Sequence, residues 1–514
     1  MQAEGRHLLV SLALALVLGA LTSAEAAPRR QILHFSDVHL NLSTSLLAAD
    51  SALIPTRYYA DAPIALLESA LSHAKQHVLA DPDLFLYTGD HAAHGQFTDE
   101  YIARAVEANV HAMEDFYPPK EGVLLETTAV IGNADGSPDY HMAVTDPTKE
   151  TNPSIELISK VWEDSLSAAN MDLLNRRGYL QYALDANLRV LTLNTVPYSV
   201  RSHVPDTSKQ SDPFGQFAWL DSTLAELQKA GKFAYLVGHI APIVDSYGGN
   251  PQWHPKYIQT YKRIVGKYAG VVKAQFFGHV HSIEFRVPVA SLDGGGKDGE
   301  GFQLPPMFIS GSISPLFGNN PSFMVWDFDS ETYEVLDFAV YGTSISDSEP
   351  QLDWKLLFQA NEAYGLASLS LAELSDFVLR LGQNSSLLED YYYNMKAQSP
   401  LTRPCSTPLC HAKTLCTLKW WTTKGQYQAC VDSVQMMTAG AADGGSQASV
   451  SSTHAASSQQ LVASDVYMAI GSTALATGVA AACVIAIVQA LNRGGVLKTR
   501  DERAAQYENV FPML

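Results

Sequence analysis

The stretch Gln31-Ile-Leu-His-Phe-Ser-Asp37-Val-His39-Leu40 decides the fold of this chain. It starts as an apolar run typical of a buried strand and ends in a carboxylate, one spacer and an imidazole. Because residues two apart in an extended chain point the same way, Asp37 and His39 are expected to converge just past the strand. One oxygen and one nitrogen ligand suit zinc, manganese or iron. A single Asp-x-His is a weak signal, so its weight depends on repetition.

Strand-like and helix-like segments alternate from this stretch to about residue 345. Alternation of this kind predicts an α/β core. The expected strands are Ile32–Phe35, Leu84–Tyr87, Val123–Ile131, Leu188–Leu193, Phe233–Val237, Lys273–Phe277 and Tyr333–Tyr341. The expected helices are Ala62–Leu79, Ile102–Phe116 and Phe217–Ala230.

Polar residues follow these strands, in most cases directly after a glycine. Ligands of open α/β sheets gather at the carboxyl ends of the strands. Glycine allows a sharp turn there and lets a loop approach a ligand closely. Five strand ends are therefore expected to build one metal site, with Asp37 and His39, Asp90, Asn133, His239, and His279 with His281.

Composition narrows the classes of protein. The chain has 514 residues and a formal net charge of −19, which argues against binding a nucleic-acid duplex because such surfaces are basic. The first of the five cysteines is Cys405, so nitrogen and oxygen ligands must hold any metal in the region before residue 282. Four cysteines lie between 405 and 430 and allow three pairings.

Both ends of the chain predict passage through the secretory pathway. Residues 1–26 are expected to be a signal peptide, since a basic start precedes a short apolar run and a small-residue cleavage site. Residues 437–465, rich in Ala, Ser, Gly and Gln, predict a flexible stalk. Residues 466–491 carry no charge and predict a single transmembrane helix, followed by a basic cytoplasmic tail at 492–514. We therefore expect a single-pass type I membrane protein of the cell surface or the secretory and endolysosomal pathway, with its catalytic domain lumenal or extracellular.

Several short motifs add to this prediction. In the tail, Tyr507 and Val510 have the spacing of a sorting signal that an adaptor would bind. Asn41 and Asn384 begin glycosylation sequons. Residues 30–345 are expected to form the catalytic domain and residues 346–436 a helical subdomain, with helices at Trp354–Tyr364, Leu369–Leu381 and Ser386–Lys396.

The spacing of the strand-end motifs resembles that of the calcineurin-like metallophosphoesterases. More narrowly, the segments Gln216-Phe-Ala-Trp219 and Gly238-His-Ile-Ala-Pro242 make the chain similar to the acid sphingomyelinase-like phosphodiesterases. This resemblance implies a four-layer α/β/β/α sandwich, a disulfide-bonded C-terminal subdomain, and the pairings Cys405–Cys410 and Cys416–Cys430.

The resemblance also implies two divalent cations, with zinc as the expected metal. Hydroxide activated by the metals would attack a phosphodiester of nucleotide, choline or sphingomyelin type. His94, the last residue of Gly89-Asp90-x-x-x-His94, would hydrogen-bond a phosphoryl oxygen or protonate the leaving group. One cation would bind Asp37, His39, Asp90 and His281, and the other would bind Asp90, Asn133, His239 and His279.

One departure from the family pattern weighs against this reading. The family has histidine directly after the metal-binding asparagine, whereas this chain has Ala134 after Asn133. Loss of such a donor or acid typically costs ~10²–10⁴ in rate, while the metal ligands are untouched. Two hypotheses follow. The protein is a working phosphodiesterase, or it is a weakened, membrane-tethered relative that binds a phosphate-bearing ligand.

Overall fold

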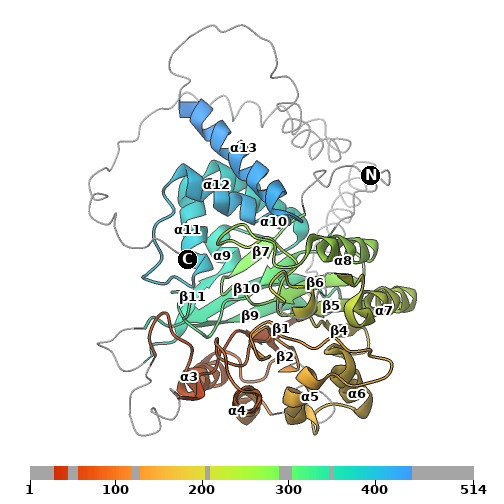
Figure 1. Ribbon diagram of the computed structural model, residues 1–514. Coiled ribbons are helices and arrows are strands. Elements are labelled where there is room, and N and C mark those ends of the chain that lie inside the picture. The colour runs from red at the N-terminus through yellow and green to blue at the C-terminus, as the bar shows by residue number, and fades with distance from the viewer. Residues whose placement is uncertain are drawn as a thin grey trace, which may run out of the picture. The chain divides into compact units, whose positions relative to one another are not determined.

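Two β-sheets stack at the centre of the protein (Figure 1). The computed structural model describes residues 28–43, 56–118, 128–202, 209–288, 304–345 and 352–442. The first sheet has the order β11-β10-β9-β1-β2, with β1 Arg29–Phe35, β2 Leu84–Tyr87, β9 Ser322–Asp329, β10 Val335–Gly342 and β11 Lys355–Gln359. The second has the order β3-β4-β5-β6-β8-β7, with β3 Leu180–Ala183, β4 Leu188–Thr192, β5 Phe233–Val237, β6 Val272–Phe277, β7 Glu284–Arg286 and β8 Met307–Ile309.

The central strands of both sheets are buried on both faces, as their continuous apolar runs require, whereas the edge strand β11 is partly exposed. Alternate residues of β1 divide between two cores: Ile32 packs between the sheets, whereas Leu33 and Phe35 pack under the helices α3 (Ile64–His73) and α4 (Asp99–Phe116). On the other side, α7 (Gln216–Ala230) and α8 (Pro255–Lys267) cover the second sheet. The layered α/β/β/α part of the predicted fold is therefore confirmed.

Parallel pairing sets the position of the site. β1 pairs in parallel with β2, and β4, β5, β6 and β8 form a parallel run. The carboxyl ends of parallel strands lie at the same edge of a sheet, so the polar residues that follow them gather there. Two more helices, α5 (Pro153–Ser159) and α6 (Ala168–Arg177), lie between α4 and β3 in the sequence.

The C-terminal region is helical and carries two disulfides. Its helices are α9 (Ala360–Tyr364), α10 (Leu371–Gln383), α11 (Ser385–Met395), α12 (Pro408–Thr417) and α13 (Lys424–Ala442). Phe377 of α10 and Tyr391 of α11 contact Phe285 of β7, so these helices share the core between the sheets. The disulfides join Cys405 to Cys410 and Cys416 to Cys430, as the resemblance implied.

Two local predictions are wrong. Trp354–Tyr364 was expected to be one helix, but its first half forms the edge strand β11, which pairs with β10, and only Ala360–Tyr364 is helical. Its apolar residues fit either period, and the pairing with β10 decides the outcome. Of the strand expected at Val123–Ile131, residues 128–131 form none, and the rest lies outside the described residues.

The transmembrane helix and the single-pass membrane location also need correction. In the ranges that the structure describes, no helix has both the length and the apolar character to cross a bilayer. The two longest, α4 with 18 residues and α13 with 19, both carry charged side chains, which a span disfavours. The predicted span at 466–491 lies outside the described residues, as do the signal peptide, the tail with Tyr507 and Val510, and nearly all of the stalk.

Candidate metal centre

The structure brings all seven predicted metal ligands together at the carboxyl edges of the two sheets. Asp37 and His39 follow β1, and Asp90 follows β2. His239 follows β5, and His279 and His281 follow β6, while Asn133 lies in the loop after residues 128–131. Two carboxylates, four imidazoles and one amide therefore meet from segments that are far apart in the sequence.

Five of these residues adopt left-handed backbone conformations. Asp37, His39, Asp90, His279 and His281 have φ values between 48° and 75°. Such a conformation costs about 1 kcal/mol or more outside glycine and tends to concentrate at functional sites. Backbone hydrogen bonds hold the turns: the amide of Asp37 donates to Gly89 O at 3.1 Å, and that of His39 to Asp90 O at 3.1 Å. The sharp turns direct neighbouring side chains into one space.

The first group of donors surrounds His39. Its Nε2 lies 3.0 Å from His281 Nε2 and 3.8 Å from Asp37 Oδ1. His281 Nε2 lies 3.4 Å from the same oxygen of Asp37. Two imidazole nitrogens and a carboxylate oxygen thus converge at ligand spacing, matching the donor set that the resemblance implied for one cation.

The second group surrounds His239. Its Nε2 lies 3.0 Å from Asn133 Oδ1 and 3.2 Å from His279 Nδ1. Asp139 accepts a hydrogen bond from Asn133 Nδ2 at 2.8 Å, which turns the amide oxygen of Asn133 toward the histidines. This arrangement matches the donor set implied for the second cation.

Asp90 stands between the two groups. Its Oδ2 lies 3.3 Å from His39 Nε2 and 2.9 Å from His239 Nε2, which is the place of a bridging carboxylate. Burial raises the pKa of Asp90 to about 6, and burial lowers the pKa of His39 to about 3. Divalent cations would favour the ionised carboxylate and the neutral imidazole, so the donor set fits a pair of such ions.

Backbone carbonyls orient two of the histidines. His39 Nδ1 lies 3.1 Å from Ala92 O, and His239 Nδ1 lies 2.8 Å from Thr88 O. A carbonyl only accepts, so each Nδ1 carries the proton and each Nε2 presents a lone pair to the centre. This is the usual support of metal-bound histidine.

Asp135 joins the loops that carry Asp90 and Asn133. Its carboxylate accepts from the backbone amides of His91 at 2.7 Å, Ala92 at 3.1 Å and Gly132 at 2.7 Å. The side chain is 2% exposed, so these bonds are shielded from water. The two loops are held in one register as a result.

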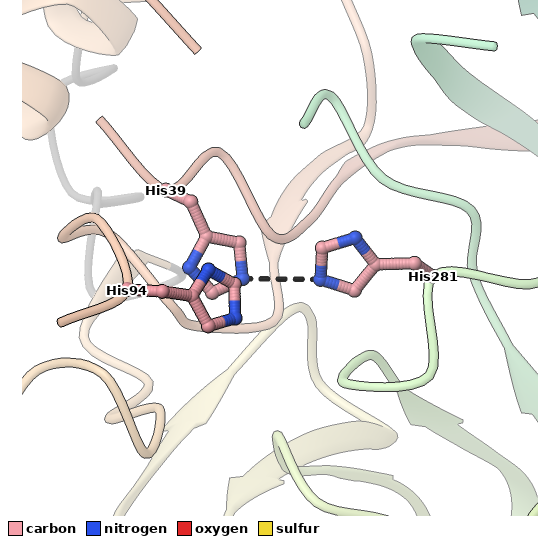
Figure 2. Close-up of side chains that lie close together, drawn as sticks. All are labelled: His39, His94 and His281. Atoms are coloured by element: carbon pink, nitrogen blue, oxygen red, sulfur yellow. Dashed lines mark hydrogen bonds between the residues drawn. The ribbon is translucent and has the colours of Figure 1, made fainter. Parts of the chain in front are cut away.

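The predicted catalytic residue His94 lies against the first group of donors. Figure 2 shows its ring beside that of His39, with His281 opposite, and the centroids of His39 and His94 are 3.7 Å apart. Nitrogens of the three histidines lie within 4.8 Å of one another. His94 therefore borders the centre, as a group that hydrogen-bonds a substrate should.

Asp61 holds His94 in place, and sequence reasoning missed it. One carboxylate oxygen lies 3.0 Å from His94 Nδ1, and the other accepts from the backbone amide of His94 at 3.0 Å. Burial lowers the pKa of His94, but the hydrogen bond and charge of Asp61 outweigh burial and give a net upward shift. The two residues are 33 positions apart in the sequence, and no motif links them.

At position 134 the structure places a methyl group beside the metal ligands. Ala134 is 3% exposed, and its backbone amide donates to Asp90 Oδ1 at 2.8 Å. The position is thus fixed next to the carboxylate of Asp90, although Ala134 offers no side-chain donor. The predicted glycosylation sites differ in exposure: Asn384 is exposed at the start of α11, whereas Asn41 is half-buried, and glycosylation of both stays a prediction.

A chain of buried hydrogen bonds connects the core to Asp37. Trp326 Nε1 donates to His34 Nδ1 at 3.2 Å, which leaves His34 Nε2 to donate to Thr88 Oγ1 at 3.0 Å. Thr88 then donates to Ser36 Oγ at 2.5 Å, and Ser36 donates to Asp37. Each link has one consistent direction, so the carboxylate orientation depends on a neutral His34.

Acid should destabilise the protein through His34. Burial lowers the pKa of His34 from 6.5 to about 3, so the unfolded chain binds this proton more readily. The stabilisation is complete above pH 6.5 and is lost as the pH falls toward 3. In His34→Gln, the free energy of unfolding should therefore depend less on pH between about 4 and 6, by ~1.4 kcal/mol per pH unit. Urea unfolding of chelated protein at several pH values measures the slope.

The exposed His111 provides the control for this prediction. His111→Gln removes an imidazole from the surface of α4 and should keep the wild-type slope. Equal slopes for the wild type and His34→Gln would contradict the expected role of His34.

Comparisons with known proteins agree with the geometry. Residues 30–282 match the calcineurin-like phosphoesterase family, and residues 301–437 match the acid sphingomyelin phosphodiesterase C-terminal region. Sphingomyelinase phosphodiesterase D of Dictyostelium discoideum is 26% identical over 443 residues, which cover 78% of this chain and 96% of that protein. Acid sphingomyelinase-like phosphodiesterase 3b of Homo sapiens is 28% identical over 363 residues, covering 66% of this chain and 75% of that protein. Sphingomyelin phosphodiesterase of Homo sapiens is 28% identical over 376 residues, covering 69% of this chain and 54% of that protein.

Proposed function

This chain belongs to the acid sphingomyelinase-like branch of the calcineurin-like phosphoesterases, and from that membership we propose that it hydrolyses phosphodiesters at a centre of two zinc ions. The observation that carries the proposal is the position of Asp90. Its Oδ2 lies within 3.3 Å of a histidine from each donor group. A shared carboxylate offsets the repulsion between two cations held a few ångströms apart.

Each of the two donor sets would bind one of the two ions. Asp90 would contribute to both, with Asp37, His39 and His281 on one side and Asn133, His239 and His279 on the other. When bound, such ions supply Lewis-acid polarisation of the phosphoryl group and a nucleophile near neutral pH. Two divalent ions carry four positive charges against two carboxylates, so the centre would attract an anion even though the protein is acidic.

The chain's own residues have distinct tasks around the substrate. His94, with 28% of its side chain exposed, would donate a hydrogen bond to a phosphoryl oxygen or a proton to the leaving group. Asp61 keeps the imidazole in one orientation for that task. The family pattern has a second hydrogen-bond donor, a histidine, where this chain has the methyl group of Ala134. His94 would therefore act on the substrate without that histidine.

The names of the relatives support a phosphodiester or phospholipid as the class of substrate. Those compared above are named sphingomyelinases or sphingomyelinase-like phosphodiesterases. We propose a substrate of the same chemical class, namely a phosphodiester of nucleotide, choline or sphingomyelin type.

Ala134 supports a second candidate function. Loss of one donor typically costs ~10²–10⁴ in rate without disturbing the ligands. On this alternative, the protein keeps its ions, turns over poorly and serves to bind a phosphate-bearing ligand.

Zinc loading provides the test. The purified protein with two equivalents of zinc should hydrolyse bis(4-nitrophenyl) phosphate at least ~10²-fold faster than chelated protein, because the ions supply several kcal/mol to the transition state. Release of nitrophenolate measures the rate, and zinc added back after chelation should restore it.

The same samples separate the two candidate functions. A zinc-loaded protein no faster than the chelated one would rule out the hydrolase under these conditions. If that inactive protein still binds inorganic phosphate in calorimetry, and loses the binding on chelation, the ligand-binding function is supported.

A further inference from the structure

We propose that Gln252 is a positioning residue for the metal ligand His279, and that Asp245 fixes the direction of the Gln252 amide. The inference rests on the proposed function, because it assumes that His279 binds one of the two cations. Both residues lie in the loop between β5 and α8, and each is 6% exposed. Neither belongs to the predicted ligands.

The direction of the Gln252 amide follows from its partners. Its Nε2 donates to Asp245 Oδ2 at 2.7 Å and approaches Asn250 O at 3.3 Å. An ionised carboxylate and a carbonyl only accept hydrogen bonds, so the amide nitrogen must occupy this side. The amide oxygen of Gln252 is thereby turned to the opposite side, toward His279.

The amide oxygen in turn fixes the tautomer of His279. Gln252 Oε1 lies 3.0 Å from His279 Nε2, and an oxygen without hydrogen can only accept. His279 Nε2 must therefore carry the proton, and its Nδ1 keeps a free lone pair. This Nδ1 lies 3.2 Å from His239 Nε2, within the second donor group. Tyr140 Oη, at 3.4 Å from His279 Nε2, is the outer neighbour of the same nitrogen.

Asp245 makes the arrangement rigid. Its Oδ1 accepts from the backbone amides of Tyr247 at 3.1 Å, Gly248 at 2.7 Å and Gly249 at 3.0 Å. The backbone amide of Gln252 also donates to Ile243 O at 2.8 Å, which closes the loop on itself. The carboxylate that orients Gln252 is thus anchored by the turn on its other side.

His279 differs from the two histidines that backbone carbonyls orient. His39 and His239 contact Ala92 O and Thr88 O, and no substitution removes those carbonyls. At His279 the corresponding partner is a side chain and can be removed. Loss of such a supporting hydrogen bond typically weakens metal binding ~10–100-fold. One cation should be affected, because His279 belongs to the second donor group alone.

The variant Gln252→Met tests this directly. Methionine has a similar length and volume but no strong hydrogen-bonding group. We expect the dissociation constant of one zinc ion to rise ~10–100-fold while that of the other stays within ~3-fold of the wild type. Zinc titration of the full chain against a competing chelator measures both constants, and elemental analysis of dialysed protein gives the stoichiometry.

Gln275→Met is the matched control. Gln275 is fully buried, accepts from Tyr261 Oη at 2.9 Å and donates to Pro305 O at 2.9 Å. Its loss removes a buried amide of the same kind without touching a ligand, so both zinc constants should stay at wild-type values. Equal weakening in this control would overturn the positioning role, because any buried amide would then have the same effect.

A double variant tests the direction of the hydrogen bonds. Asp245→Asn combined with Gln252→Glu exchanges the carboxylate and the amide, so an N–H still points at position 252 and an oxygen still accepts from His279. Zinc affinity should return to within ~3-fold of the wild type, which a loss of packing would not explain. Weak binding in the folded double variant would overturn the proposed chain of hydrogen bonds.

The outcomes separate this inference from the proposed function. Wild-type protein that binds two ions but hydrolyses no phosphodiester would remove the function and leave the inference standing. Gln252→Met with wild-type affinity for both ions would overturn the inference alone. If Gln252→Met does not fold, Gln252→Asn replaces it, since its amide is one methylene too short to reach His279, and the same outcomes apply.

Discussion

Asp90→Asn should abolish binding of the two zinc ions and lower the rate of phosphodiester hydrolysis by ~10³-fold or more, because the zinc ions supply several kcal/mol to the transition state. Asp90 Oδ2 lies 2.9 Å from His239 Nε2 and 3.3 Å from His39 Nε2, so one oxygen serves both donor groups. Asparagine removes the negative charge that offsets the repulsion between the ions. It also replaces one carboxylate oxygen with an NH₂ group, which cannot bind a cation.

Elemental analysis and nitrophenolate release measure the two effects on the same sample. Asp337→Asn is the control: Asp337 is 1% exposed in β10 and accepts from the backbone amides of Phe338 at 2.8 Å and Asn361 at 3.0 Å. It loses the same charge from a buried site away from the donors, and should keep two ions and the wild-type rate. Asp90→Asn with two bound ions and full activity would contradict a bridging role.

The seven predicted metal ligands could be identified from the sequence because their placement follows a local rule. Each of the seven stands just after a strand or an apolar run, and parallel pairing brings such ends to one edge. A motif such as Asp37-x-His39 therefore predicted which side chains would meet. It did not predict the backbone, because both residues lie past β1 in left-handed turns and not in the extended chain that was assumed. Glycine precedes Asp90 and His279. No glycine adjoins Asp37, His39 or His281, so the left-handed turns at these three residues had no such signal in the sequence.

The supporting residues were not predictable in the same way. Asp61 reaches His94 from 33 positions away, and Gln252 reaches His279 across 27. Neither belongs to a periodic pattern, and each is placed by a loop whose course depends on tertiary contacts. The prediction of a helix at Trp354–Tyr364 was wrong for a related reason, because the pairing of β11 with β10 overrides the helical spacing of its apolar residues.

Ala134→His should raise turnover of bis(4-nitrophenyl) phosphate ~10²-fold or more, because it restores a donor of the kind whose loss costs ~10²–10⁴. The position is already well placed. Its backbone amide donates to Asp90 Oδ1 at 2.8 Å, and its neighbours are the ligand Asn133 and the loop-joining Asp135. A side chain added here starts beside the bridging carboxylate. Steady-state rates at matched zinc content measure the gain.

Ala134→Phe separates the chemistry of the imidazole from its bulk. The phenyl ring fills similar space without a nitrogen, so it should give no increase in rate. If Ala134→His with two ions turns over no faster than the wild type, the missing histidine does not limit the rate, and His94 with Asp61 must suffice. If instead the wild type is inert and Ala134→His is active, the natural chain has kept the metal centre while losing catalysis, which favours ligand binding as its function.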